Sequence, residues 1–206
     1  MKVERCASSL ATEVVIREHY LHRRPPISFA YSLTDVREVV VGVVSFGIPA
    51  SRNMLTGACP TSPESVVELN RLWVSDEMAT NTESWFVSRA LKLLPPRIVL
   101  SYADTTRGHY GTVYRALNFH YAGWTDMERK TPRFDYIPTD PTKHTREASR
   151  SGCSEKRRRL PKIKYWTTSG TPAERRRLAT ICRWPSLDWN ACPPPGAAAS
   201  LDGAVA

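Results

Sequence analysis

The stretch that decides the fold is RIVLSYADTTRGHYGTVYRA, residues 97–116. It opens with the apolar, β-branched run Arg97–Leu100, which is typical of a buried strand. Asp104 stands where this strand gives way to a turn, and His109 and Tyr114 follow within a short helix-like segment. Because α/β proteins bind their ligands at the carboxyl ends of strands, this turn is the first candidate for a functional site.

Helical and strand patterns alternate on either side of this stretch. The spacing of apolar residues predicts a helix over residues 10–24, which Pro25 prevents from continuing. Further helices are predicted over 82–94 and near 109–118, and strands over 29–33, 36–46, 66–74, 97–102 and 120–124. This order indicates a mixed α/β (α+β) fold, with a central mixed sheet flanked by helices.

Composition divides the chain into three parts. We predict a catalytic domain over residues 1–140, a basic segment over 141–190, and a disordered tail over 191–206, where proline and small residues dominate. Within the first part, residues 52–64 contain glycine and proline and are expected to form a surface loop. The chain's 206 residues suffice for one domain with a substantial core and an appendage.

The positive charge is concentrated near the C-terminus. Between Lys143 and Arg183 there are 13 Lys and Arg but three Glu, a charge of +10, so the rest of the chain carries −1 of the net +9. This asymmetry favours a polyanion partner, most simply nucleic acid, although a solvated basic tail has the same composition. The residues expected to contact DNA phosphates are Arg157, Arg158, Arg159, Lys162, Lys164, Arg175 and Arg176. Tyr165, Trp166 and Trp184 are interleaved with them and can stack on bases or pack a small subdomain.

The cysteines and the apolar segments indicate a reducing, cytoplasmic setting. The five cysteines are odd in number and form no CxxC pair, which favours free thiols over a disulfide framework or a zinc site. No segment has the pattern of a signal peptide or the length of a membrane span. We therefore expect no membrane partner.

Several short motifs in collinear order resemble a known family. They are HYLH at 19–22, GVVSFG at 42–47, ELNRLW at 68–73, SYAD at 101–104 and GHYGTVY at 108–114. The order of elements and the segment 111–119 resemble the GNAT acyltransferase fold. The five motifs together resemble the phage Mom family of DNA adenine-modifying proteins, over roughly residues 12–124.

The resemblance implies an activity and a site. A Mom-like enzyme transfers a small acyl or carbamoylmethyl-type group to the N6 amine of adenine in double-stranded DNA, which protects phage DNA from restriction. Carried over residue by residue, the catalytic positions of the family match His19, Tyr20, Arg71, Asp104 and Tyr114. Asp104 is expected to act as a base or a metal ligand, Tyr114 as an acid, and Arg71 to hold the donor or orient Asp104. His19 with Asp104 forms a nitrogen–carboxylate pair that suits Fe(II) or a similar ion.

The chain departs from ordinary GNAT enzymes in one loop. Those enzymes hold the pyrophosphate of acyl-CoA with a glycine-rich loop at a helix N-terminus. Here residues 75–84 contain no glycine and three acids. An anion would have to rest on the N–H groups near Asn81 and Ser84, which are the candidate cofactor-binding residues. The donor is therefore open between acetyl-CoA and another activated small metabolite.

Each candidate residue also has a purely structural interpretation. Asp104 can cap the next helix, Tyr114 can pack on the sheet, and His19 can be favourably placed at a helix C-terminus. Arg71 lies in an otherwise apolar strand and needs a partner, either Asp104, Glu68 or a bound anion. Two rival functions remain. A GNAT acetyltransferase acting on a protein or small amine would bind acyl-CoA without DNA, and a non-enzymatic DNA-binding protein would not need Asp104 or Tyr114.

Overall fold

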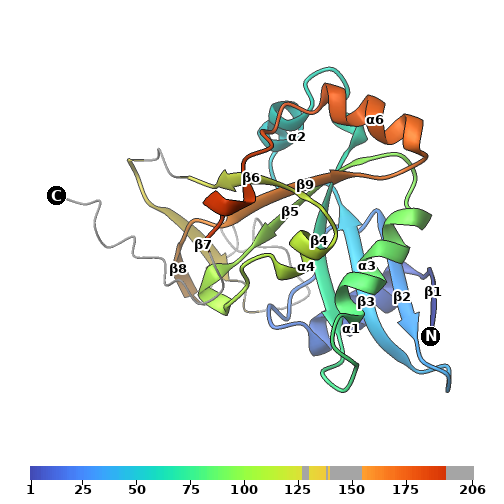
Figure 1. Cartoon of the computed structure of the whole chain (residues 1–206). Helices are drawn as coiled ribbons and strands as arrows, with labels where there is room; N and C mark the ends of the chain where they lie inside the picture. Colours follow the sequence, from blue (N-terminus) through green and yellow to red (C-terminus); the bar gives the residue numbers. More distant parts are fainter. Residues whose placement is uncertain (127–129, 138, 140–154, 194–206) are drawn as a thin grey trace.

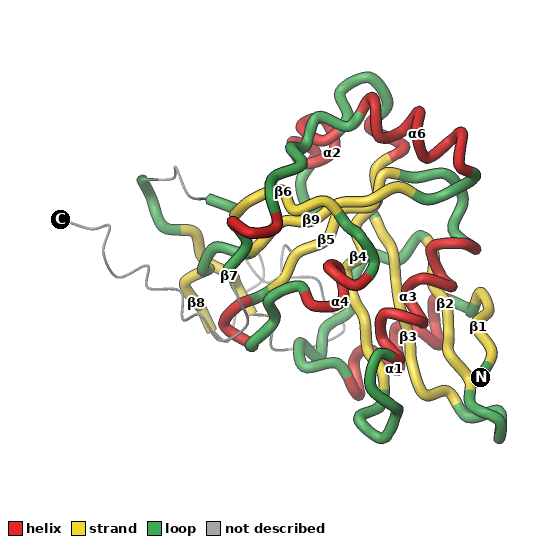
Figure 2. Tube along the Cα trace, in the orientation of Figure 1, coloured by secondary structure: helices red, strands yellow, loops and turns green. Residues whose placement is uncertain are grey.

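A seven-stranded mixed sheet forms the body of the protein, as seen in a computed structural model that describes residues 1–126, 130–137, 139 and 155–193 (Figures 1 and 2). The strand order is β1-β2-β3-β4-β5-β9-β6, and β7 and β8 form a separate two-stranded hairpin. The strands are β1 (Lys2–Arg5), β2 (Phe29–Thr34), β3 (Val40–Gly47), β4 (Val66–Val74), β5 (Ile98–Ala103), β6 (His120–Trp124), β7 (Arg133–Ile137), β8 (Glu155–Arg159) and β9 (Ile163–Thr168). The expected mixed α/β class is confirmed.

Helices cover both faces of this sheet. The helices are α1 (Ser8–Glu18), α2 (Arg52–Ala58), α3 (Thr82–Leu93), α4 (Thr112–Ala116) and α6 (Pro172–Ile181), with 3₁₀ turns η1 (Pro63–Ser65), η2 (Thr105–Arg107) and η3 (Trp189–Ala191). Phe86 and Ala90 of α3 pack with Leu69 of β4 in one core cluster. Ala58 of α2 and Leu178 of α6 pack in another cluster, on the opposite face. No helix among the described residues is both long and apolar enough to cross a membrane.

The central strands β4 and β5 separate part-way along their length. They are the one parallel pair of the main sheet and are paired in register only from Val66 opposite Ile98 to Glu68 opposite Leu100. β4 then runs on to Val74 and β5 to Ala103 without further pairing between them. The two strands therefore leave an opening in the middle of the sheet, at the carboxyl end of β5.

A β-bulge in β4 lies beside this opening. Leu69 and Arg71 pair with consecutive residues of β3, which makes Asn70 the additional residue. The Asn70 amide is held on both sides, since it accepts a hydrogen bond from Ser45 Oγ at 2.7 Å and donates one to the Pro26 carbonyl at 2.6 Å. Bulges redirect the side chains that follow them. This one fixes the direction of Arg71.

The first two helices differ from their sequence predictions. The helix expected over 10–24 ends at Glu18, and His19 is already extended, with ψ 136°. His19 and His22 therefore do not share a helix face, and His22 has a φ of 43° in the turn that follows. The predicted loop over 52–64 contains α2, whose buried Ala58 packs under the sheet. The glycine and proline residues favour a loop, but the packing of Ala58 in the core stabilises a helix over residues 52–58.

The basic segment contributes directly to the main sheet. β9 lies between β5 and β6, although it follows both in the sequence. Its Ile163, Tyr165 and Trp166 are buried, so the two aromatic residues pack in the core rather than extending towards a ligand. The domain boundaries remain a prediction. Most of the predicted tail, from residue 194 onwards, and residues 141–154 of the basic segment lie outside the described residues.

Candidate active site

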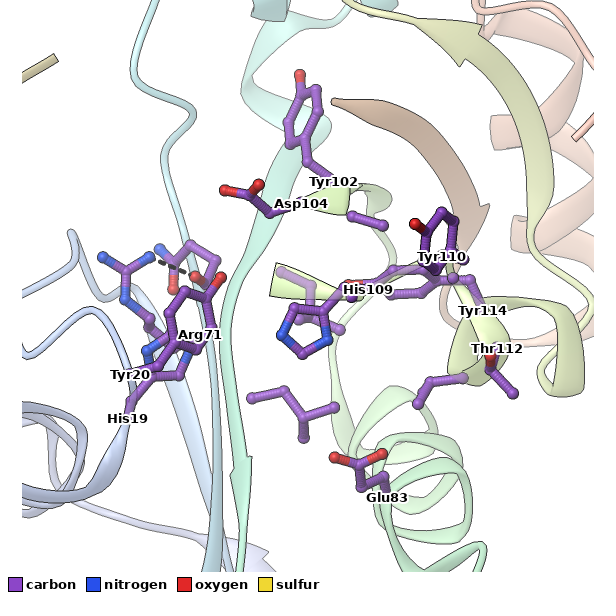
Figure 3. Close-up of a pocket in the computed structure, with 17 residues that line it drawn as sticks. His19, Tyr20, Arg71, Glu83, Tyr102, Asp104, His109, Tyr110, Thr112 and Tyr114 are labelled. Atoms are coloured by element: carbon purple, nitrogen blue, oxygen red, sulfur yellow. Dashed lines mark hydrogen bonds between the residues drawn. The ribbon is translucent and has the colours of Figure 1, made fainter. Parts of the chain in front are cut away.

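A cavity of about 260 Å³ lies at the opening between β4 and β5 (Figure 3). Its walls come from the turn after α1, the middle of β4, the end of β5 and the loop that leads into α4. All five predicted catalytic residues, His19, Tyr20, Arg71, Asp104 and Tyr114, line it. The fold thus brings into one cavity residues that are up to 95 positions apart in the chain.

His19 is a neutral hydrogen-bond donor in this cavity. Its Nδ1 accepts a hydrogen bond from the backbone N–H of Leu21, with 3.1 Å between the two nitrogens, so the ring proton lies on Nε2. Burial, together with the nearby charge of Arg71, lowers the pKa of His19 to about 3. The imidazole therefore remains uncharged at neutral pH and serves better as a donor or ligand than as an acid.

Tyr20 extends an aromatic wall from His19 across the cavity mouth. Its ring stacks on His19 at 4.3 Å and meets His109 at 5.4 Å, and the Arg107 guanidinium lies 5.6 Å from its ring centre. Sequence reasoning did not select His109 as a site residue. Its position five residues after Asp104, in the same turn, was the available signal.

Arg71 carries an unused donor at the cavity wall. Its Nη1 donates to the Asn70 carbonyl at 2.6 Å, but among the described residues nothing accepts a hydrogen bond from its buried Nε. Burial lowers the pKa of Arg71 to about 10, so the guanidinium is still charged at neutral pH. Of the partners expected for it, Asp104 is paired elsewhere and no ion pair with Glu68 is formed. The remaining option is a bound anion or a polarised carbonyl.

Asp104 is an ionised carboxylate with both oxygens engaged. It caps η2, where Oδ1 accepts bonds from the backbone N–H of Thr106 at 3.2 Å and from its hydroxyl at 2.5 Å. Oδ2 forms an ion pair with Lys162 Nζ at 2.9 Å. Burial alone would raise the pKa of Asp104, but Lys162 and Thr106 outweigh it and hold the pKa below its ordinary value. This geometry makes Asp104 a weak base and a firm positioning group.

Tyr114 presents a protonated hydroxyl at the opening in the sheet. The Ser101 hydroxyl donates to Tyr114 Oη at 2.6 Å, which leaves the tyrosine proton available. Burial raises the pKa of Tyr114 to about 12. The ring is fixed between Phe119, at 5.1 Å, and Tyr165, at 4.9 Å. Such a group can donate a proton to a leaving group.

The loop before α4 fixes the position of Tyr114. Gly111 has a φ of 80°, in the left-handed region, and a Cβ at this position would overlap the Tyr165 hydroxyl. That hydroxyl donates in turn to the Tyr110 carbonyl at 3.0 Å. A residue other than glycine would therefore displace the first turn of α4.

The cofactor and metal predictions receive less support. Within the described part of the chain, no three His, Cys, Asp or Glu side chains are grouped as a metal site, so the pair His19 and Asp104 has no third ligand there. Neither Asn81 nor Ser84 lines the cavity, whereas Glu83 does. A carboxylate at the N-terminus of α3 opposes a diphosphate at that position. The side chains present do not fit the pyrophosphate of CoA.

The residues predicted to contact DNA fall on three elements. Arg157, Arg158 and Arg159 lie on β8, Lys162 and Lys164 on or just before β9, and Arg175 and Arg176 on α6. Arg157 is paired with Glu155 at 2.9 Å, and Lys162 with Asp104. Arg159, Lys162 and Lys164 also line a second cavity, of about 480 Å³. Their contact with DNA stays a prediction.

Comparisons with known proteins agree with the motifs. The sequence model of the Mom protein family matches residues 1–180. The methylcarbamoylase Mom of Escherichia phage Mu is 33% identical over 129 residues, a match that covers 60% of this chain and 54% of the phage Mu protein. The matched region thus spans about half the length of that relative.

A solved structure has the same fold. A GNAT superfamily phosphinothricin acetyltransferase from Sinorhizobium meliloti, in complex with AcCoA, superposes with a TM-score of 0.50 over 82% of this chain and 88% of its own. The two sequences are 13% identical, so the likeness is one of fold.

Proposed function

The chain belongs to the Mom protein family, and from that premise we propose that it is a transferase that modifies the N6 amine of adenine in double-stranded DNA. The transferred group is a small acyl or carbamoylmethyl-type group. The modification protects the DNA from restriction in the cytoplasm of the host cell.

One observation carries the proposal. The cavity at the opening between β4 and β5 gathers a neutral imidazole, a charged guanidinium with an unused donor, an ionised carboxylate and a protonated phenol. These groups suit a group transfer to an amine, in which a donor must be polarised and a leaving group protonated. Figure 3 shows Arg71 and Tyr20 on one side of this cavity and Tyr114 on the other.

The roles follow from the groups that line the cavity. The Arg71 guanidinium and the His19 Nε2–H donate to the carbonyl or anionic oxygen of the donor. The N6 nitrogen forms a bond to the transferred carbon while the bond from that carbon to the leaving group breaks. The amine loses one proton to solvent, the leaving group gains one from Tyr114, and solvent returns a proton to Tyr114. Asp104 fixes the η2 turn and Lys162 beside the reacting amine.

The donor is a small activated metabolite rather than an acyl-CoA that is bound through its pyrophosphate. Glu83 at the cavity wall opposes a diphosphate, and the loop before α3 has no glycine. A compact donor that fits the 260 Å³ cavity and presents an oxygen to Arg71 meets the constraints of the site.

Restriction sensitivity tests this proposal. Plasmid DNA from cells that express the chain is digested with endonucleases whose sites contain adenine, and with others whose sites contain only guanine and cytosine. Resistance confined to the adenine-containing sites supports the proposal. Full digestion by both sets of enzymes, with the protein soluble and expressed, contradicts it.

A further inference from the structure

A second cavity opens on the other face of the sheet, towards α2. It measures about 480 Å³ and shares six lining residues with the first cavity, namely Tyr20, Leu69, Asn70, Arg71, Tyr102 and Asp104. The two cavities therefore meet at the opening between β4 and β5. A donor in the first cavity and an acceptor in the second would approach each other through this opening.

Glu68 is a carboxyl on the wall of this second cavity with no assigned role. It is the last β4 residue paired with β5, immediately before the strands separate. Among the described residues, none donates a hydrogen bond to its carboxyl or lies within ion-pair distance of it. Burial raises the pKa of Glu68 to about 7, against the opposing effect of Arg71 and Lys162. A carboxyl that is left without a partner in this way is suited to a ligand.

Aromatic rings form an adjacent wall of the same cavity. Tyr102 and Trp184 meet edge to face, with ring centres 6.0 Å apart, and both line the cavity. In Figure 3 the Tyr102 ring points away from the residues around the first cavity. Trp184 is held by its neighbours, because Arg183 N–H donates to the Ala58 carbonyl at 2.8 Å and the Pro185 carbonyl accepts from Trp166 at 2.9 Å. Fixed aromatic faces are suited to stacking on a base.

Positive side chains surround this cavity. The basic residues that line it are Arg23, Arg24, Arg133, Arg159, Lys162 and Lys164. The acidic lining residues are Glu68, Asp104 and Asp126, and of these Asp104 and Asp126 are paired with Lys162 and Arg133. Within the described part of the chain, Glu68 is thus the acidic lining residue that has no ion pair. A polyanion that brings a flat polar group into the cavity matches this distribution.

The carboxyl of Glu68 has the hydrogen-bonding pattern for one kind of base edge. A neutral carboxylic acid offers one O–H donor beside one carbonyl acceptor. The Watson–Crick edge of adenine offers the complementary pair, with N1 as acceptor and the N6 amine as donor. Unsubstituted purine keeps N1 but lacks the N6 amine, so it leaves the acceptor oxygen of the acid without a donor.

We propose that the second cavity binds the adenine extruded from the duplex and that the Glu68 carboxyl pairs with its Watson–Crick edge. This inference rests on the proposed function and assigns the acceptor half of the site. Tyr102 and Trp184 form the aromatic wall beside the base, and the surrounding Lys and Arg side chains hold the phosphates next to it. The N6 amine is then presented through the opening to the donor cavity.

The test measures binding rather than catalysis. Fluorescently labelled duplexes carry one adenine, or one unsubstituted purine that lacks the N6 amine, opposite an abasic site, so that extrusion costs little. Their affinities for the purified full chain are compared by fluorescence anisotropy for wild type, Glu68→Gln and Glu68→Ala. The wild type is expected to prefer adenine at least tenfold. Glu68→Gln, whose amide also pairs one donor with one acceptor, keeps that preference, and Glu68→Ala loses it.

Two results would overturn the inference. One is an undiminished adenine preference in Glu68→Ala. The other is a loss in Glu68→Gln as large as in Glu68→Ala, since the carboxylate charge rather than the pairing pattern would then matter. Modification of DNA by the wild type is measured separately. Modified DNA with no dependence of base preference on Glu68 refutes this inference alone, whereas adenine preference without any modified nucleoside refutes the proposed function alone.

Discussion

Replacing Tyr114 by phenylalanine separates the chemistry of the site from its stability. The change removes only the hydroxyl, and the ring keeps its contacts with Phe119 and Tyr165. One hydrogen bond is lost, from Ser101, but the Ser101 hydroxyl has a second acceptor in the Leu69 carbonyl at 3.2 Å. No buried group is left unpaired, so the free energy of unfolding should fall by only about 1 kcal/mol. For a chain of this size that corresponds to a decrease in Tm of about 2–4 °C.

The effect on activity should be far larger. If Tyr114 donates the proton to the leaving group, its loss should slow the reaction by about 100- to 10,000-fold. The assay is the rate at which modified adenosine accumulates in plasmid DNA after induction, at matched protein levels. Urea unfolding of the purified variant measures the change in stability alongside it.

Tyr121→Phe is the matched control for this variant. Tyr121 is a buried tyrosine on β6 whose hydroxyl donates to the Ala191 carbonyl at 3.5 Å, and it does not line the active-site cavity. It should lose similar stability and keep its activity. A Tyr114→Phe rate within about threefold of wild type would refute the role of Tyr114 as an acid. An equal loss in Tyr121→Phe would mean that the loss reflects the fold.

Other substitutions test separate parts of the account. Burial holds the pKa of His19 near 3 in the folded protein, whereas in the unfolded chain this histidine is protonated below about pH 6.5. Between these two values the free energy of unfolding of the wild type should therefore fall by up to about 1.4 kcal/mol for each pH unit that the pH is lowered. Urea unfolding of His19→Gln at pH 7.5, 6.0 and 5.0 should show this pH dependence reduced, and an unchanged slope would count against a buried neutral imidazole. Gly111→Ala should lower the free energy of unfolding by about 2–4 kcal/mol in the same assay, because of the left-handed φ and the overlap of the added Cβ with Tyr165. A decrease below about 1 kcal/mol would be incompatible with that geometry. Lys164→Ala should reduce the slope of log K for duplex binding against log salt concentration by about 0.9, because one phosphate contact is lost. The control Lys92→Ala, on α3 on the other face of the sheet, should leave this slope unchanged. Equal effects of the two variants would argue against DNA binding at the second cavity.

The fold was predicted from the sequence where local pattern and tertiary structure agree. The strands at 66–74 and 98–103 and the helix from Thr82 have apolar spacing that matches the face they bury. The sequence did not reveal β9, because Lys162 before it and Lys164 within it were interpreted as part of the basic segment. Five of the six β9 residues are nonetheless buried, in a strand that lies between β5 and β6. A strand inserted out of sequence order depends on long-range pairing, which local pattern does not encode.

The candidate site was predicted from motifs, and its electrostatics were not. The five residues selected from the sequence all line one cavity, although their catalytic roles remain predictions. The pairing of Asp104 with Lys162 joins two elements 58 positions apart and was not predicted, since Lys162 was interpreted as a phosphate contact. Glu68 was noticed only as a partner for Arg71. Its exposure to a cavity depends on the separation of two strands, which the sequence of either strand alone does not show.

We propose that this chain modifies adenine in DNA through the cavity between β4 and β5. This proposal is tested by mass spectrometry of nucleosides from plasmid DNA, in cells that express the wild type or Asp104→Ala. We expect an adenosine species of increased mass with the wild type that is absent with Asp104→Ala, while both proteins are soluble and folded. Unmodified adenosine with an expressed, soluble wild type would contradict the account, as would the same modified species in both samples.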